Sequence, residues 1–366
     1  MKEVKTETVD LIVTSPPYPM IEMWDDMFSQ QNTEIGNALS NLDGNTAFHL
    51  MHHELNKVWQ ESYRVLKQGG FLCINIGDAT RTINKNFQLY SNHSRIIHHC
   101  LELGFQNLPN IIWRKQTNAP NKFMGSGMYP PGAYVTLEHE YILIFRKGSK
   151  REFKTEIEKE NRKSSGFFWE ERNVWFSDIW YDLKGIGQNL HNDKLRKRSA
   201  AFPLELAYRL VNMFSIKNDI VLDPFLGTGT TTMAAITAER NSIGYEIEGC
   251  FSDLIESTLE NSLAFSNRII EDRLRRHVLF VYNKIHENNY NFKNENLVYN
   301  FPCISNQEKW ILIKSLKEIK QVRNNCFKAT YSDRPQKKYC NLFKKENCDD
   351  LMGIVHTLPK KVLPLF

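Results

Sequence analysis

A strand, a glycine-rich loop, a helix and a second strand follow one another between residues 220 and 247, and this unit constrains the fold more than any other feature. The apolar run Ile220 to Leu222 leads into Asp223-Pro224-Phe225-Leu226-Gly227-Thr228-Gly229-Thr230-Thr231. We expect a helix from about Thr230 to Arg240 and a strand from Ser242 to Ile247. This order is typical of an α/β fold with a mostly parallel sheet flanked by helices.

The same alternation of strand and helix runs through the first half of the chain. Short runs rich in Val, Ile and Leu predict strands, and apolar residues spaced three and four apart predict helices. Lys67-Gln68-Gly69-Gly70 predicts a turn between a helix and the next strand. After about residue 267 the alternation weakens. The expected strands are 9–14, 71–76, 108–114 and 141–146, and the expected helices are 48–66, 94–103 and one that begins near Pro203.

Composition excludes several classes of protein. A length of 366 residues suggests about two domains, and 41% hydrophobic residues are enough for a buried core, which excludes disorder. No apolar run has the length of a membrane span, and the first residues lack a secretory pattern, so we expect a cytoplasmic protein with no membrane partner. The seven cysteines contain no C-x-x-C pair, and we therefore expect reduced thiols and no metal site.

Charge is distributed unevenly along the chain. The net charge is +5, but residues 265–366 hold 19 basic and 10 acidic residues, which leaves the rest of the chain mildly acidic. A basic tail on an acidic body suggests that one part handles a polyanion while another part has a different task. The alternative is a solvated lysine-rich surface without a partner.

The glycine-rich loop has the features of a nucleotide site. Gly227 and Gly229 allow a sharp turn at the end of a strand, where backbone N–H groups are exposed to a ligand. Glu246 follows about 20 residues later, where an acid can bind ribose hydroxyls. The loop lacks the lysine of a phosphate-binding P-loop, which excludes that motif. The alternative is an ordinary tight turn between strand and helix.

The loop Ser15-Pro16-Pro17-Tyr18, which ends the first strand, predicts more specific chemistry. Two successive prolines remove two N–H donors, so the carbonyl groups of this loop are free to accept hydrogen bonds. The exocyclic amine of a nucleobase is such a donor. If Ser15 Oγ and a proline carbonyl accept its protons, its lone pair can attack a methyl group, while Tyr18 offers a face for stacking. A proline-rich turn after a core strand is the alternative.

Together the two loops resemble those of the amino-group DNA methyltransferases that use S-adenosylmethionine, over roughly residues 8 to 264. In that family Asp-Pro-Phe-x-Gly-x-Gly-Thr-Thr is the cofactor loop, and Ser-Pro-Pro-Tyr is a catalytic loop. The catalytic loop comes first here, as in the circularly permuted beta class. The resemblance implies a Rossmann-like class I methyltransferase fold and catalytic residues Ser15, Pro16, Pro17 and Tyr18. It implies a cofactor site made of Asp223, Pro224, Phe225, Gly227, Thr228, Gly229, Thr230, Glu246, Phe202 and Pro203.

The resemblance also implies a reaction and its partners. Ser-Pro-Pro-Tyr is more typical of enzymes that methylate N4 of a flipped cytosine, whereas Asp-Pro-Pro-Tyr accompanies N6-adenine. We therefore expect a site-specific N4-cytosine methyltransferase that modifies double-stranded DNA as one arm of a restriction-modification system. An N6-adenine enzyme and methylation of an RNA or protein amine stay open, as does a DNA-binding module with a decayed cofactor pocket. A homodimer and a separately encoded endonuclease are further partners to test, and in a prokaryote the protein would associate with the nucleoid.

C5-cytosine chemistry is disfavoured because it needs a thiolate in a Pro-Cys-Gln context, and Pro302-Cys303 is followed by isoleucine. We divide the chain into a catalytic half (1–146), a candidate target-recognition insertion (147–191), a cofactor-binding half (192–264) and a basic accessory segment (265–366). Residues 116–134 are a further candidate for target recognition, because they are too long and glycine-rich for a plain connector.

Overall fold

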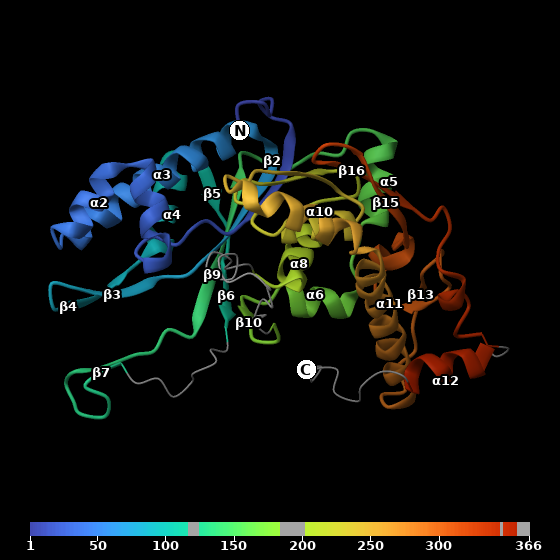
Figure 1. The fold of residues 1–366 in the computed structure, drawn as a ribbon. Coiled ribbons are helices and arrows are strands. Elements are labelled where there is room, and N and C mark those ends of the chain that lie inside the picture. Colours follow the sequence, from blue (N-terminus) through green and yellow to red (C-terminus); the bar gives the residue numbers. More distant parts are fainter. Residues whose placement is uncertain (116–123, 184–201, 345–346, 357–366) are drawn as a thin grey trace. The chain divides into compact units, whose positions relative to one another are not determined.

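A computed structural model describes residues 1–115, 124–183, 202–344 and 347–356 (Figure 1). The α-helices are α1 Asp25–Gln31, α2 Thr33–Ser40, α3 Gly44–Val65, α4 Asn92–Glu102, α5 Glu156–Ser164, α6 Trp169–Trp175, α8 Leu204–Phe214, α9 Thr230–Thr237, α10 Ser252–Glu260, α11 Leu263–His286 and α12 Cys348–His356. Short 3-10 helices are η1 Glu22–Trp24, η2 Gly249–Phe251, η3 Asn306–Trp310 and η4 Lys337–Tyr339. Parts of both candidate recognition segments, residues 116–123 and 184–191, lie outside the described residues.

The strands of the main sheet follow the order β10-β6-β9-β2-β1-β11-β12, and β5 pairs with β9. β1 runs parallel to β2, and β6 runs parallel to β10, whereas β9 is antiparallel to β2, β5 and β6. These strands are β1 Val9–Thr14, β2 Leu66–Ile76, β5 Phe105–Asn107, β6 Ile111–Arg114, β9 His139–Lys147, β10 Ile179–Trp180, β11 Ile220–Asp223 and β12 Asn241–Gly244. The sheet with its helices confirms the predicted α/β class.

The chain forms two compact units. Unit 1 contains Met1–Arg151, Asp178–Leu206 and Leu222–Gly227, and unit 2 contains Glu152–Ser177, Ala207–Val221 and Thr228–Phe366. The boundary passes through β11. The tail thus belongs to the same unit as part of the predicted insertion, while the boundaries of the four predicted segments stay predictions.

The predicted turn at Gly69-Gly70 is wrong, because β2 begins at Leu66, directly after α3. Val9 pairs with Leu66 and Leu11 pairs with Phe71, so the extra residues of β2 form a bulge opposite β1. Gly69 has a φ of 79°, and a Cβ atom there would lie 2.6 Å from the backbone nitrogen of Arg151. Glycine is therefore needed for the bulge, not for a turn.

Two hairpins that the periodicity did not predict extend from the sheet of unit 1 (Figure 1): β3 Ala79–Ile83 with β4 Asn86–Tyr90, and β7 Met124–Gly125 with β8 Ala133–Tyr134. The first hairpin turns at Asn84 and Lys85, which both have positive φ, as a two-residue hairpin loop requires. Phe87 stacks on Tyr134 with ring centroids 4.7 Å apart, which joins the two hairpins.

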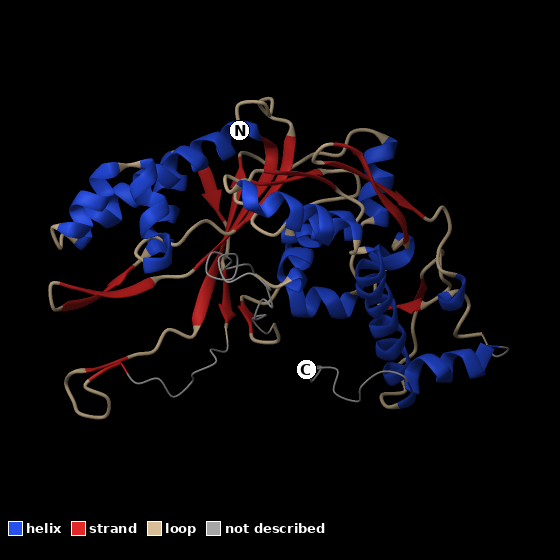
Figure 2. Cartoon of the chain, viewed as in Figure 1, coloured by secondary structure: helices blue, strands red, loops and turns tan. Residues whose placement is uncertain are grey.

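Unit 2 is built around α11, the long helix that begins where the predicted alternation weakens (Figure 2). The buried positions of α11 recur every three or four residues, as on the inner face of an amphipathic helix. Arg273 and His277 occupy two of these positions, so the apolar pattern is interrupted in the sequence. The helix packs in a core that joins Phe168 to the tail, with Ile270, Leu274, Val278, Tyr299, Phe301, Ile311, Ile313, Tyr339, Leu342 and Leu351. The tail also contains β13 Asn294–Glu295, β14 Pro302–Cys303, β15 Leu316–Arg323 and β16 Cys326–Tyr331.

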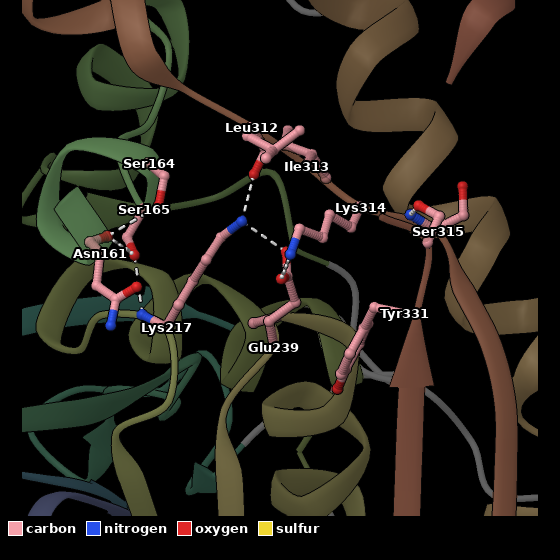
Figure 3. Close-up of polar contacts among 12 residues, drawn as sticks. Asn161, Ser164, Ser165, Lys217, Glu239, Leu312, Ile313, Lys314, Ser315 and Tyr331 are labelled. Carbon is pink, nitrogen blue, oxygen red and sulfur yellow. Dashed lines mark hydrogen bonds and ion pairs between the residues drawn. The ribbon is translucent and has the colours of Figure 1, made fainter. Parts of the chain in front are cut away.

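A buried polar network joins three segments of unit 2 around Lys217 (Figure 3). Lys217 Nζ donates to the backbone oxygen of Leu312 and pairs with Glu239 Oε1, both at 2.6 Å. Its backbone N–H donates to Ser165 Oγ at 2.8 Å, and Glu239 also pairs with Lys314 at 3.6 Å. Because Lys217 is buried and the Glu239 side chain is only 11% exposed, each charge requires the other. The network thus holds part of the tail against the turns that flank β11 and α9.

His277 lies in a second buried polar cluster with Glu170 and Glu308. One ring nitrogen of His277 and one carboxylate oxygen from each glutamate lie within 4.8 Å of one another. His277 Nδ1 is 2.8 Å from Glu170 Oε1, while Glu308 accepts backbone N–H groups from Trp169 and Ser305. These hydrogen bonds account for the closeness of the groups without an ion, and the expectation that the protein holds no metal stays a prediction.

The cluster predicts a pH dependence of stability. Burial lowers the pKa of His277, but the charges of Glu170, Glu308 and Glu171 outweigh it and raise that pKa above 6.5. The protonated His277 therefore stabilises the fold fully at a pH below its pKa in the unfolded chain. This stabilisation is lost as the pH rises through the higher pKa that His277 has in the folded protein. Denaturant titrations at about pH 6 and about pH 8 should show a fall in the free energy of unfolding that His277→Gln removes. An equal change in the free energy of unfolding between the two pH values in wild type and variant would contradict this assignment.

Among the described residues, no helix is both long and apolar enough to cross a membrane.

Candidate active site

The predicted catalytic loop follows a strand that is buried along its whole length. β1 ends at Thr14, and the chain then enters Ser15-Pro16-Pro17-Tyr18. The two prolines are buried, whereas Ser15 and Tyr18 are half-buried. The rigid prolines thus hold two polar side chains at the end of a core strand, where an open α/β sheet binds its ligands.

The hydroxyl of Tyr18 is the centre of a hydrogen-bond network. It accepts from Ser15 Oγ at 3.2 Å and from Asn75 Nδ2 at 2.8 Å, and it donates to Glu140 Oε2 at 3.0 Å. Burial raises the pKa of Tyr18 well above 10, and the negative charge of Glu140 raises it further. Tyr18 therefore stays protonated and acts as a donor to Glu140.

Glu140 comes from β9 and is held by contacts at both carboxylate oxygens. Asn75 Nδ2 donates to Oε2, and Lys115 Nζ pairs with Oε1, both at 2.7 Å. Glu140 is 9% exposed, whereas the Lys115 side chain is 44% exposed. One carboxylate oxygen thus faces Tyr18 and Asn75, and the other pairs with a lysine whose side chain is partly exposed.

Sequence reasoning missed Asn75, Glu140 and Lys115. Asn75 is a polar residue inside the apolar run FLCINI, Glu140 stands directly before the run YILIF, and both are buried. A buried polar side chain in a core strand needs a partner, so these two residues were a usable signal. The pairing of β2 with β9 places Asn75 opposite Ile142, and Tyr141 opposite Ile76, so the two strands bring the polar side chains together.

The first part of the predicted cofactor loop starts beside the catalytic loop. Thr14 Oγ1 donates to Asp223 Oδ1 at 2.6 Å, and both side chains are buried. The same oxygen accepts the backbone N–H of Phe225 at 3.0 Å, and the Phe225 ring lies edge-on to Trp59. Asp223 therefore shapes the loop from within. Thr14 was another residue that sequence reasoning missed.

The two glycines of the loop adopt the conformation that only glycine takes readily. Gly227 has a φ of 53° and Gly229 a φ of 84°, and Gly229 is the residue directly before α9. This left-handed backbone turns the chain from β11 into the helix. Thr228, between the two glycines, and Thr230, the first residue of α9, lie with their hydroxyls 3.4 Å apart.

The other predicted cofactor residues, Phe202, Pro203 and Glu246, lie outside the glycine-rich loop. Phe202 and Pro203 are buried in unit 1, and α8 begins directly after Pro203, as predicted. β12 ends at Gly244, before the predicted end of that strand, so Glu246 lies in the following loop. There its Oε1 accepts the backbone N–H of Glu248 at 2.9 Å. The joint role of these residues in cofactor binding stays a prediction.

Comparison with known proteins places the chain in a family. A family model described as a DNA methylase of the N6/N4 type matches residues 9–257, which is more than half of the chain. The chain belongs to this DNA methylase family. The catalytic loop precedes the cofactor loop within the matched region, so the resemblance to the permuted beta class is confirmed.

Two curated relatives are similar to the methylase over most of its length. The type II methyltransferase M.MthZI of Methanothermobacter thermautotrophicus is 53% identical over 92% of this chain and 94% of its own length. The type II methyltransferase M.MjaI of Methanocaldococcus jannaschii is 50% identical over 71% of this chain and 88% of its own. The similarity to M.MthZI thus extends well into the basic tail of the methylase.

A solved structure shares both sequence and fold with the methylase. A Thermus thermophilus protein, described as a putative DNA modification methylase and crystallised with S-adenosyl-L-methionine, is 34% identical to it. The match covers 70% of this chain and 87% of that protein, with a TM-score of 0.54. The predicted class I methyltransferase fold is therefore confirmed.

Proposed function

We propose that this methylase transfers a methyl group from S-adenosylmethionine to N4 of a flipped cytosine in double-stranded DNA. The observation that carries the proposal is the Ser15-Pro16-Pro17-Tyr18 loop at the end of β1, beside the start of the cofactor loop at Asp223. A serine hydroxyl and proline carbonyls suit a neutral amine donor, and the family's Ser-Pro-Pro-Tyr form favours cytosine over adenine.

The cofactor is S-adenosylmethionine, which the related Thermus thermophilus structure also holds. When bound, it supplies an electrophilic methyl group on a positively charged sulfur. The residues proposed to hold it are Asp223, Pro224, Phe225, Gly227, Thr228, Gly229, Thr230, Glu246, Phe202 and Pro203. The left-handed glycines Gly227 and Gly229 support this assignment, because a loop without Cβ atoms at these positions lets a ligand approach its backbone.

The chain's own residues bind and orient the target amine. Ser15 Oγ and the Pro16 carbonyl accept the amine protons, which favours a pyramidal nitrogen whose lone pair is available for attack. Tyr18 contributes its ring as a stacking surface while its hydroxyl is tethered by Asn75 and Glu140. Catalysis then depends mainly on holding the amine and the methyl group in line.

We further propose a biological setting and partners. The names of the type II relatives support a role as the modification arm of a restriction-modification system, with a separately encoded endonuclease. The methylase would act in the cytoplasm on nucleoid DNA, as a homodimer. Exposed cations on the β15–β16 hairpin supply positive charge suited to the DNA backbone, namely Lys317, Lys320, Arg323 and Lys328.

Transfer of labelled methyl groups tests this function. Purified protein with labelled S-adenosylmethionine should label duplex DNA, and modification-sensitive sequencing should find N4-methylcytosine at one short sequence. N6-methyladenine at such a site would keep the DNA methyltransferase and overturn the choice of base. Label in RNA or protein alone would overturn the choice of substrate.

Replacing Glu246 by alanine should weaken cofactor binding about 10- to 100-fold, because a carboxylate that binds two hydroxyl donors is lost. Calorimetric titration with S-adenosylmethionine measures this, with Glu260→Ala, an exposed carboxylate at the end of α10, as the control. An unchanged affinity would show that Glu246 serves the structure of its loop and does not bind the cofactor.

A further inference from the structure

Ser15, Tyr18 and Glu140 form an unbroken series of hydrogen bonds that leads away from the catalytic loop. Ser15 Oγ donates to Tyr18 Oη, and Tyr18 Oη donates to Glu140 Oε2. Every link points the same way, from the loop toward a buried carboxylate. Stacking a base requires only the ring of Tyr18, so the proposed function leaves this polar series without a task.

Methyl transfer to an amine creates a need for such a series. When the neutral amine nitrogen bonds to the methyl carbon and the carbon–sulfur bond breaks, the nitrogen carries a positive charge and one proton too many. A base that takes up this proton as the carbon–nitrogen bond forms keeps positive charge from building up on the nitrogen and so speeds the transfer itself. The Ser15 hydroxyl is a poor final base, but it can accept one proton if it releases its own.

We infer that Ser15, Tyr18 and Glu140 act as a proton relay for the methylated amine, an inference that rests on the proposed function. The nitrogen gives its proton to Ser15 Oγ, the Ser15 proton passes to Tyr18 Oη, and the Tyr18 proton passes to Glu140 Oε2. One N–H bond breaks and one O–H bond forms on the carboxylate, so the amine becomes neutral and Glu140 becomes a neutral acid.

The surroundings of each group fit its task in the relay. The pKa of Tyr18 is raised, so a free phenolate is costly and the proton must leave for Glu140 as another arrives. Asn75 Nδ2 donates to both Tyr18 Oη and Glu140 Oε2 and so fixes the distance between them. Lys115 holds the other oxygen of Glu140 from the surface side, where the proton can return to water.

A purely structural role is the alternative, in which Glu140 only keeps Tyr18 in place. Two conservative variants separate the two roles. Glu140→Gln keeps an oxygen that accepts from Tyr18 but cannot take up a proton. Tyr18→Phe keeps the stacking ring but breaks the series. A positioning role predicts that both variants stay active, whereas a relay predicts that both fail.

The test measures single-turnover methyl transfer to DNA by the full-length protein. We expect each variant to be about 100-fold slower than wild type, with affinities for S-adenosylmethionine and DNA within about threefold. Because both variants cut one path, the double variant should be no slower than the single ones. The wild type should show a solvent deuterium isotope effect on this rate that both variants lack, because only the intact series moves protons during the transfer step.

The matched control is Glu138→Gln, which removes an exposed carboxylate two positions before Glu140 that pairs with Arg114. It should keep the wild-type rate. A rate within about threefold of wild type for Tyr18→Phe or Glu140→Gln would overturn the relay while leaving the methyltransferase intact. A wild type that labels no DNA would overturn the proposed function itself, so the two failures are distinguishable.

Discussion

Replacing Ser15 by alanine is expected to lower the single-turnover rate of methyl transfer about 100- to 1000-fold while leaving the affinity for S-adenosylmethionine within about threefold. The substitution removes a group that accepts a proton of the target amine, and it also removes the first member of the relay to Tyr18. Rapid-quench measurement with labelled cofactor gives the rate, and calorimetry gives the affinity.

The control is Ser94→Ala, an exposed hydroxyl in the first turn of α4, which should change neither quantity. If Ser15→Ala abolished cofactor binding, the loop would belong to the cofactor site and the catalytic assignment would fail. Tyr18→Ala should also abolish methylation, because it removes both the stacking ring and the hydroxyl.

Replacing Glu171 by alanine is expected to lower the free energy of unfolding by about 3–5 kcal/mol, because it leaves the charge of Arg273 buried and unpaired. Arg273 makes two hydrogen bonds to Glu171, donates to the backbone oxygen of Gly166 at 3.1 Å and lies 5.3 Å from the ring centroid of Trp175. The pair joins α6 to α11, and its loss should loosen the core between them. Denaturant titration measures the change.

Two further variants test whether the loss of stability comes from the buried pair of Glu171 and Arg273. Glu318→Ala removes an exposed carboxylate paired with Lys320 on β15, and it should cost less than about 1 kcal/mol. Combining Glu171→Leu with Arg273→Met replaces both charges by apolar side chains and should recover most of the lost stability. If Glu171→Ala unfolded no more easily than the surface variant, the pair would not hold the tail to the rest of unit 2.

Sequence patterns predicted most of the sheet, because its strands are short, buried and nearly continuous in apolar residues. β1 matches its predicted bounds, and β9 and β11 are close to theirs. The patterns failed at the long helix α11 of unit 2, which buries Arg273 and His277 on its inner face. A charged residue is normally assigned to the surface, and only the carboxylates of other segments make these two positions buried.

In the candidate active site, too, sequence patterns predicted some residues and missed others. Motif spacing located Ser15 to Tyr18 and Asp223 to Thr231, since both are contiguous stretches that the family match covers. The distant partners of Tyr18 come from β2 and β9, Glu140 is paired in turn with the residue after β6, and no local pattern connects these residues. They could be identified only once strand pairing had brought them together.

The sequence by itself determined the α/β class, the order of the two loops and the family, because each depends on residues adjacent in the chain. Only the tertiary structure decided which side chains complete the catalytic loop and how the basic tail is held. The hydroxyl of Tyr18, the carboxylate of Glu140 and the ion pairs of Lys217 and Arg273 each join segments far apart in sequence. A buried polar group acquires its partner, and therefore its role, only when folding removes water from around it.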